Sequence, residues 1–246
     1  MDTLGSSNQE SKFIPKPHFI AYIDILGYEE KVNNGDMKLA KNIDSILDIA
    51  SDVAKEYLKE YLGKHNAKDI GIKIKAFSDN VIMCTEDNWD VLFLIVGFLQ
   101  SYMIHNGYFV RGAMCHSELH FDERFIFGKG IIKAYKIESN IAKFPRIILH
   151  SSYKDAVSSL EKDKIIFDAF TSAAGMLPMY LHDDDGYKFL NYLEIVRTMQ
   201  MLKAKQDFGD ILKSHREQII YSIAHCEKCS LQPAIMENFF MVLSIS

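Results

Sequence analysis

Two aspartates, Asp24 and Asp79, are the residues of this chain whose setting points most directly to chemistry. Asp24 lies near the end of the apolar run FIAYIDIL at residues 19–26, and a carboxylate there needs a metal ion, an arginine or a helix N-terminus as partner. Asp79 follows Phe77 and Ser78 at a break between two strand-like runs. Two carboxylates that meet raise each other's pKa unless a cation lies between them. Mg²⁺ binds through one or two carboxylates plus substrate phosphates, so the pair predicts a metal–triphosphate site.

The elements that would bring these aspartates together are a first strand at 19–26 and a hairpin beside it. The hairpin is predicted from the strand-like runs 70–76 and 80–85, which flank the break that contains Asp79. The alternative for Asp79 is a turn-forming role only, in an Asx-type turn. Apolar spacing predicts the remaining elements, which are helices at 38–62, 87–103 and 128–141 and strands at 108–115 and 146–150. Gly112 is expected to allow close packing of backbones in its strand.

The order of these elements predicts an α+β fold, with helices on one face of a largely antiparallel sheet. Its centre is a βαββαβ core of the ferredoxin-like or palm type. We expect a disordered lead-in at 1–17, a main domain at 18–155, and a C-terminal extension of mixed, partly helical structure at 156–246 packed on the core. Within that extension, 162–170 is a short strand or helix and 210–225 a long helix.

Composition narrows the classes of function. The chain has 246 residues, of which 48% are hydrophobic and 25% charged, as in ordinary soluble globular proteins. Its net charge of -5 weighs against a general nucleic-acid or membrane-surface binder. The polar start MDTLGSSNQESK has no signal-peptide core, and no apolar run is long enough to span a membrane. We therefore expect a cytoplasmic protein with no nucleic-acid or membrane partner.

Two further patterns are weaker. The segment His225–Cys229 contains one CxxC, for which a zinc site competes with two plain thiols at a helix end. The acidic run Asp183–Asp185 is expected to be a solvated turn or a weak Ca²⁺ site. The phosphate-binding loop GxxxxGK[ST] and the nucleophile elbow GxSxG do not occur in the sequence.

Five segments in chain order resemble the motifs of class III nucleotidyl cyclases, and together they cover roughly residues 19–155. They are AYIDILGY (21–28), KAFSD (75–79), RGAMCHSEL (111–119), FGKGIIKAYKIES (127–139) and PRIILHSSY (145–153). In style they are most similar to the compact bacterial cyclases of the Pycsar anti-phage systems, which make cCMP or cUMP as alarm signals.

This resemblance implies the site and the reaction. Asp24, Asp79 and the backbone carbonyl of Ile25 would hold two Mg²⁺ or Mn²⁺ ions, and a nucleoside triphosphate would be converted to a 3′,5′-cyclic nucleotide and pyrophosphate. The working unit would be a head-to-tail homodimer with sites at the interface. One subunit would supply the aspartates and the other the helix at 127–138. The product would act on an effector that responds to cyclic nucleotides.

The sequence also departs from the family. Ile132 stands where the family has its transition-state Asn, and Lys136 stands for its Arg. Phe125 replaces the acid or cysteine that selects purines, which favours a pyrimidine substrate, CTP or UTP. Candidates for neutralising phosphate are Lys136, Arg111 and Arg146, although a salt bridge is the alternative for Arg111.

Lys75, Phe77 and Phe125 are the candidates for the base pocket, with a solvated strand face as the alternative for Lys75. Glu138 matches the acid at the end of the family helix and is expected to be structural. Two other functions compete with cyclisation. One is a weak or inactive nucleotide-binding homologue, which the changes at Ile132 and Lys136 would suit. The other is a palm-type synthase that joins nucleotides, although the sequence has no GGDEF-like run.

Overall fold

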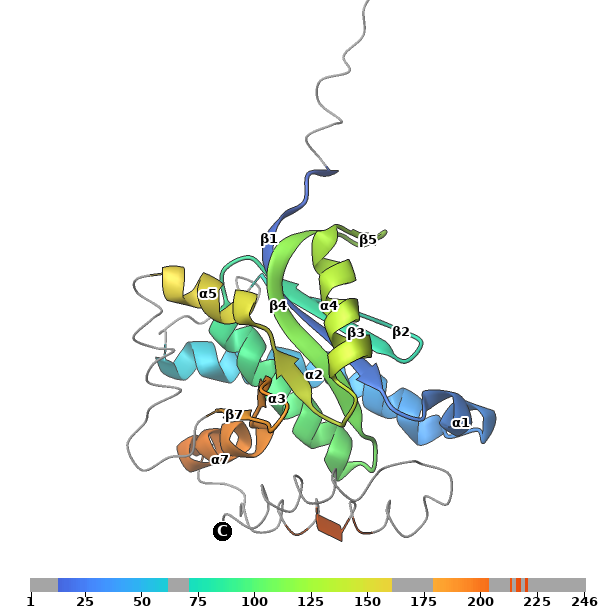
Figure 1. Cartoon of the computed structure of the whole chain (residues 1–246). Helices are drawn as coiled ribbons and strands as arrows, with labels where there is room; N and C mark the ends of the chain where they lie inside the picture. Colours follow the sequence, from blue (N-terminus) through green and yellow to red (C-terminus); the bar gives the residue numbers. More distant parts are fainter. Residues whose placement is uncertain are drawn as a thin grey trace, which may run out of the picture.

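The computed structural model describes residues 13–61, 71–160 and 179–203, together with 213, 216, 217 and 220. Its elements are β1 (Lys16–Ile25), α1 (Tyr28–Asn33), α2 (Met37–Tyr61), β2 (Lys73–Phe77), β3 (Asn80–Thr85), α3 (Trp89–His105), β4 (Val110–Phe121), β5 (Ile126–Phe127), α4 (Lys129–Ile141), β6 (Ile147–Leu149), α5 (Ser151–Ser159), β7 (Tyr180–His182), β8 (Lys188–Leu190) and α7 (Tyr192–Lys203). Figure 1 shows them along the chain. No helix in the described ranges has the length and apolar character that crossing a membrane requires.

The sheet has the order β2-β3-β1-β4-β6-β8-β7, and β5 pairs with β4 beside this path. All described strand pairs are antiparallel except β4 with β6. The first part of the chain runs β1-α2-β2-β3-α3-β4 and gives the strand order β2-β3-β1-β4. This is the ferredoxin-like βαββαβ arrangement, so the predicted α+β fold class is confirmed.

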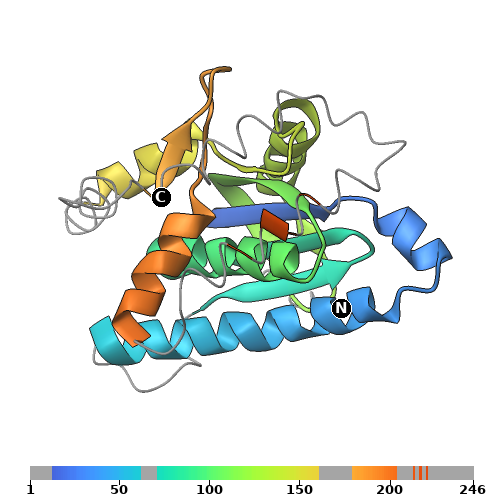
Figure 2. The same ribbon diagram turned by 90° about the horizontal axis from the view of Figure 1, so that it is seen from below.

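Helices cover both faces of the sheet, and the expectation of one covered face is wrong (Figures 1 and 2). Alternate residues of β1 point to opposite faces. Ile23 belongs to a core that includes Leu39 of α2 and Leu92 of α3. Ile20 belongs to a second core, which includes Ala134 of α4. Because β1 is buried on both sides, its sequence is a continuous apolar run and does not reveal how many faces are covered.

Most predicted elements lie where the sequence places them, with boundaries moved by a few residues. The strand predicted at 108–115 is longer, because β4 continues to Phe121. The lead-in predicted at 1–17 overlaps β1, which begins at Lys16. The rest of that lead-in (1–12), the element at 162–170, the helix at 210–225 apart from a few single residues, and the CxxC segment lie outside the described residues. The domain boundaries therefore stay a prediction.

Gly112 allows β1 and β4 to approach closely, as the sequence predicts. A Cβ atom at this position would lie 2.4 Å from the Tyr22 carbonyl oxygen and 3.2 Å from the Ile23 Cα atom. Both are backbone atoms in the centre of the sheet, so neither can move without disturbing the strand register. The residue before Gly112 is Arg111, so this contact also fixes the strand position from which Arg111 extends.

We expect Gly112→Ala to lower the free energy of unfolding by about 3 kcal/mol, because the added methyl group collides with fixed backbone. Gly97→Ala is the matched control, since the three atoms nearest to its methyl group would be side-chain atoms of Ile195, the first at 2.5 Å, and not backbone. In α3 that change also gains helix propensity, so its net cost should be about 1 kcal/mol or less. Urea unfolding followed by circular dichroism measures both. Equal losses for the two variants would contradict the assigned role of Gly112.

Candidate active site

A two-residue turn brings Asp79 next to the end of β1. Phe77 of β2 pairs with Asn80 of β3, which leaves Ser78 and Asp79 as the turn. Asn80 in turn pairs with Asp24 across β1 and β3. The Ile25 amide donates a hydrogen bond of 2.8 Å to the Asp79 carbonyl oxygen. The Asp79 turn thus lies beside the end of β1, close enough for Asp79 to raise the pKa of Asp24.

Ser78 gives this turn its shape. Its φ is 53°, and it is the one non-glycine residue with a positive φ in the described part of the chain. Turns of two residues between antiparallel strands need such backbone angles, which glycine adopts at least cost. A serine here keeps a less favourable conformation, and strained positions of this kind often lie at functional sites. The strained residue directly precedes Asp79.

Arg111 links Asp24 to a third acid. It lies opposite Asp24 in the β1–β4 register, and its Nε donates a hydrogen bond of 2.9 Å to Asp24 Oδ2. The same Nε forms an ion pair of 2.7 Å with Glu138 Oε1. Glu138 comes from the last turn but one of α4 and is buried, with 3% of its side chain exposed. Sequence reasoning treated Glu138 as structural only, and its place in the family motif was the signal that could have placed it at the site.

The group has more acids than cations: Arg111 pairs with Asp24 and Glu138, and Asp79 lies next to Asp24. Burial raises the pKa of Asp24 above its ordinary value, Arg111 lowers it, and Asp79 raises it again. Burial likewise raises the pKa of Glu138, against the opposing effect of Arg111 and with further increases from Asp24 and Asp79. Burial and then the same three acids raise the pKa of the Tyr22 hydroxyl to about 12. This end of the sheet therefore favours an additional cation.

The available donor atoms suit a divalent cation whose coordination shell is completed by phosphate oxygens of the substrate. Within the described ranges, no group of three or more His, Cys, Asp or Glu residues is arranged to hold a metal ion by itself. Asp24 and Asp79 supply two carboxylates, and the Asp79 Oδ1 atom already accepts a hydrogen bond of 2.5 Å from Asn80. Mg²⁺ commonly takes one or two protein carboxylates and fills its octahedron with phosphate oxygens and water. The pair fits that pattern, and a role for the Ile25 carbonyl stays a prediction.

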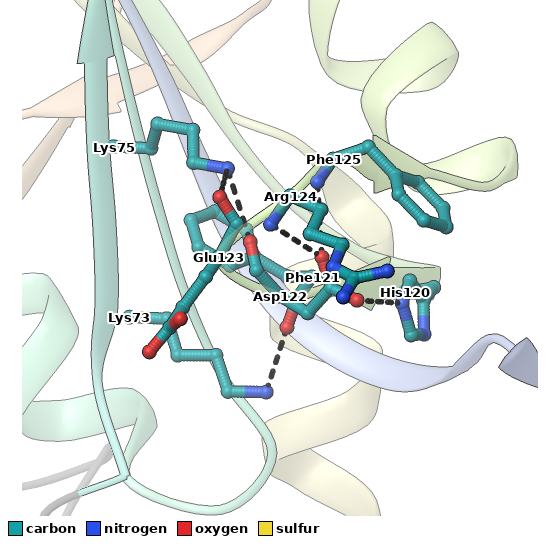
Figure 3. Close-up of polar contacts among 8 residues, drawn as sticks. All are labelled: Lys73, Lys75, His120, Phe121, Asp122, Glu123, Arg124 and Phe125. Atoms are coloured by element: carbon teal, nitrogen blue, oxygen red, sulfur yellow. Dashed lines mark hydrogen bonds and ion pairs between the residues drawn. The ribbon is translucent and has the colours of Figure 1, made fainter. Parts of the chain in front are cut away.

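The candidates for the base pocket lie on β2 and on the loop after β4 (Figure 3). Lys75 Nζ donates to the carbonyl oxygens of Asp122 and Glu123 at 3.0 and 3.1 Å, so its ammonium is bound and does not simply face solvent. Phe125 lies two residues further along the same loop and is 41% exposed. Phe77 is 52% exposed beside the Ser78 turn.

The structure does not pair Lys136 or Arg146 with Asp24 or Asp79, in contrast to Arg111. Lys136 is exposed on α4, as is Ile132 one turn before it. Arg146 is buried, and its guanidinium forms ion pairs with Asp183 and Asp185 of the β7–β8 turn. The predicted turn is present, and its Asp185 side chain stays 40% exposed, but the Asp183 side chain is 10% exposed and is not solvated as expected. Arg146 ties this turn to the core, and its predicted contact with phosphate has no geometric support here.

Replacing Arg111 should expose the charge imbalance. We expect Arg111→Met to lower the free energy of unfolding at pH 7.5 by about 3 kcal/mol, because buried carboxylates lose their partner. The pKa values of Asp24 and Glu138 are raised in the folded state, so the folded state binds these protons more tightly than the unfolded state. Stability from this source is present at acid pH and is lost as pH rises, so the deficit of the variant should shrink toward pH 5.

Thermal melts at several pH values, with and without Mn²⁺, measure this effect. Mn²⁺ should raise the melting temperature of Arg111→Met more than that of the wild type, because it supplies the missing positive charge. Arg124→Met, at an exposed position, is the matched control and should change little. A deficit that does not depend on pH or Mn²⁺ would show that the acids are not the cause.

Comparison with known proteins finds structural similarity only, at low sequence identity. No family model matches the chain, and no curated protein matches it. Among solved structures, an adenylate/guanylate cyclase/hydrolase from Silicibacter pomeroyi is 15% identical, with 58% of this chain and 80% of that chain covered at a TM-score of 0.40. A bacterial light-regulated adenylyl cyclase is 11% identical, with 83% and 57% covered at a TM-score of 0.42.

A class III adenylyl cyclase-like ATP-binding protein from Pseudomonas aeruginosa is 11% identical, with 75% of this chain and 40% of that chain covered and a TM-score of 0.41. The chain thus spans less than two thirds of the length of the last two proteins. Sequence identities this low can speak only to the fold. TM-scores this low do not strengthen the assignment of the fold either. The chemistry has to be judged from the residues at the end of β1.

Proposed function

We propose that this chain is a nucleotide cyclase that converts a nucleoside triphosphate to a 3′,5′-cyclic nucleotide and pyrophosphate. The observation that carries the proposal is the position of Asp79, in the β2–β3 turn, beside Asp24 at the end of β1. A second support is the resemblance of five ordered sequence segments to class III nucleotidyl cyclases. The excess of acids over cations in the group suits a cation that arrives with its triphosphate.

The residues have distinct tasks in this mechanism. Asp24 and Asp79 would hold two Mg²⁺ or Mn²⁺ ions, which when bound lower the pKa of the ribose 3′-hydroxyl and neutralise phosphate oxygens. The 3′-oxygen, having lost its proton to water, attacks the α-phosphorus in line. The bond from that phosphorus to the bridging oxygen breaks, and pyrophosphate leaves. Arg111 lies beside the same carboxylates and would neutralise charge on the phosphates.

A head-to-tail homodimer would complete the site, by resemblance to the same family. The exposed side chains of β5 and α4 support it, because Phe127, Ile132 and Tyr135 are 62%, 56% and 53% exposed. Apolar groups of this size are suited to burial against a second copy. Lys136 is exposed on the same helix and would reach the triphosphate held by the partner.

Pyrimidine selectivity and an alarm function are the finer parts of the proposal. Phe125 stands where purine-selecting relatives have an acid or cysteine, so CTP or UTP is favoured. The product would act on an effector that responds to cyclic nucleotides, in anti-phage defence. Such a reaction belongs in the cytoplasm, where nucleoside triphosphates are available.

A nucleotide-binding homologue without turnover is the second candidate, and two observations favour it. An isoleucine, Ile132, occupies the position of the transition-state Asn. Arg111 already neutralises Asp24, which competes with a metal ion for that carboxylate. Product analysis separates this candidate from the cyclase, and also from a synthase that joins two nucleotides.

The decisive experiment incubates the purified protein with Mn²⁺ and each of ATP, GTP, CTP and UTP. We expect pyrophosphate and a cyclic mononucleotide, with a pyrimidine substrate preferred. Asp79→Ala should lower turnover at least about 100-fold, because one of the two carboxylate ligands is lost. Asp44→Ala, at an exposed position of α2, is the matched control and should keep wild-type turnover. Tight binding of a triphosphate with no product would instead support the second candidate.

The shared site can be tested by complementation. Asp79→Ala and Lys136→Met would each damage every site of its own homodimer. In a heterodimer of the two variants, one site would have both changes and the other would have neither. Mixing equal amounts after subunit exchange should therefore restore about a quarter of wild-type turnover, since half the dimers are mixed and half their sites are intact. No gain over the separate variants would contradict sites built from two subunits.

A further inference from the structure

The loop between β4 and β5 is fixed from two directions by side chains that the mechanism above does not use. β4 ends at Phe121, and β5 begins at Ile126 and pairs back with it. Residues 122–125 therefore form the tip of a tight hairpin. This tip directly precedes α4, the helix that carries Ile132 and Lys136.

Two lysines of β2 hold one side of this loop (Figure 3). Lys73 and Lys75 lie two residues apart and so extend from the same face of the strand. Lys73 Nζ donates a hydrogen bond of 2.9 Å to the Phe121 carbonyl oxygen. Lys75 Nζ donates to the next two carbonyls, of Asp122 and Glu123. Three charge-assisted hydrogen bonds thus anchor consecutive peptide groups, although two strands separate β2 from β4 in the sheet.

The Asp122 side chain holds the loop from within. Its Oδ1 accepts hydrogen bonds from the amides of Arg124 and Phe125 at 2.8 and 2.9 Å. Its Oδ2 lies 3.0 Å from Nε2 of His120. These bonds, led by that from the Phe125 amide, lower the pKa of Asp122 to about 2. The carboxylate is therefore ionised at neutral pH, and the main chain of Phe125 is held in one place.

The ring of Phe125 packs against two other rings, those of His120 and Phe13. Its centroid lies 5.1 Å from that of His120 and 5.8 Å from that of Phe13, which is nearly parallel to it at 27°. His120 is the residue that Asp122 also contacts, so one carboxylate orients both the backbone and the neighbour of this ring. Even so, Phe125 is 41% exposed. A rigid aromatic ring that is partly open to solvent is suited to stacking against a flat heterocycle.

We propose that Lys73 and Asp122 are positioning residues that set the Phe125 ring as the stacking surface for the nucleobase of the substrate. The inference rests on the proposed function, because it names the part of that site that receives the base. It changes the expected role of Lys75, which acts on the main chain of the loop together with Lys73. Selectivity among bases would then depend on where the loop places Phe125, and chemistry at the triphosphate would depend on the aspartates.

The test measures binding of ATP, GTP, CTP and UTP by calorimetry, and turnover of each, for wild type, Lys73→Met, Lys73→Arg, Asp122→Asn and Lys41→Met. We expect Lys73→Met and Asp122→Asn to raise Kd and KM for the preferred base about tenfold and to reduce discrimination, with kcat within about threefold. Lys73→Arg keeps a cationic N–H donor for the Phe121 carbonyl and should restore the preference. Lys41→Met, at an exposed position of α2, should match wild type.

A double-mutant cycle with Phe125→Ala shows whether Lys73 acts through that ring. If it does, Lys73→Met should add little to the effect of Phe125→Ala on Kd, so the two changes should not be additive. Additive effects, or a loss of kcat with unchanged base preference, would overturn the inference and leave the cyclase proposal standing. If the wild type binds triphosphates without turnover, and Lys73→Met still lowers base discrimination, the cyclase proposal fails and the inference holds. If the wild type binds none of the four, both fail.

Discussion

The register between β1 and its two neighbours is the constraint on which the site depends. It places Asp24 opposite Arg111 on one side and beside the Asp79 turn on the other. A shift by one residue would turn Asp24 to the other face of the sheet and separate it from Arg111. The close approach at Gly112 and the left-handed turn at Ser78 hold this register from both sides. The backbone geometry thus holds Asp24 and Asp79 close together despite the repulsion between their carboxylates.

The α4 helix connects the acids with the loop that precedes it. Its start follows Phe127 and Gly128, and its last turns supply Glu138 to Arg111. Gly130 packs against the side chain of Ile20 and the carbonyl of Glu118, so the helix lies close to both β1 and β4. The helix therefore follows the loop that carries Phe125 and contributes Glu138 to the pair with Arg111. Base contacts near its start and charge changes near its end would therefore share one structural support.

Sequence reasoning predicts the parts of this structure that local spacing encodes. The short break at Phe77–Asp79 between two strand-like runs predicts the hairpin, and the hairpin predicts where Asp79 lies relative to Asp24. Contacts between segments far apart in the sequence are not encoded by local spacing. Arg146 pairs with acids 37 and 39 residues away, and nothing in the spacing identifies that choice. Lys73 donates to a main-chain carbonyl, a group that every residue carries, so the sequence cannot name its acceptor.

Arg111 explains how a site with one buried and two partly buried acids can be stable before any substrate arrives. One guanidinium neutralises part of the charge of Asp24 and Glu138, and Asp79 adds a third carboxylate, so the group carries an excess of negative charge when all three acids are ionised. A triphosphate alone would add to that excess and be repelled, whereas its complex with divalent cations would reduce it. The same arrangement gives Arg111 an alternative partner when phosphate oxygens come near. We therefore expect the balance of charge at the end of β1 to favour a metal–triphosphate complex over a free triphosphate.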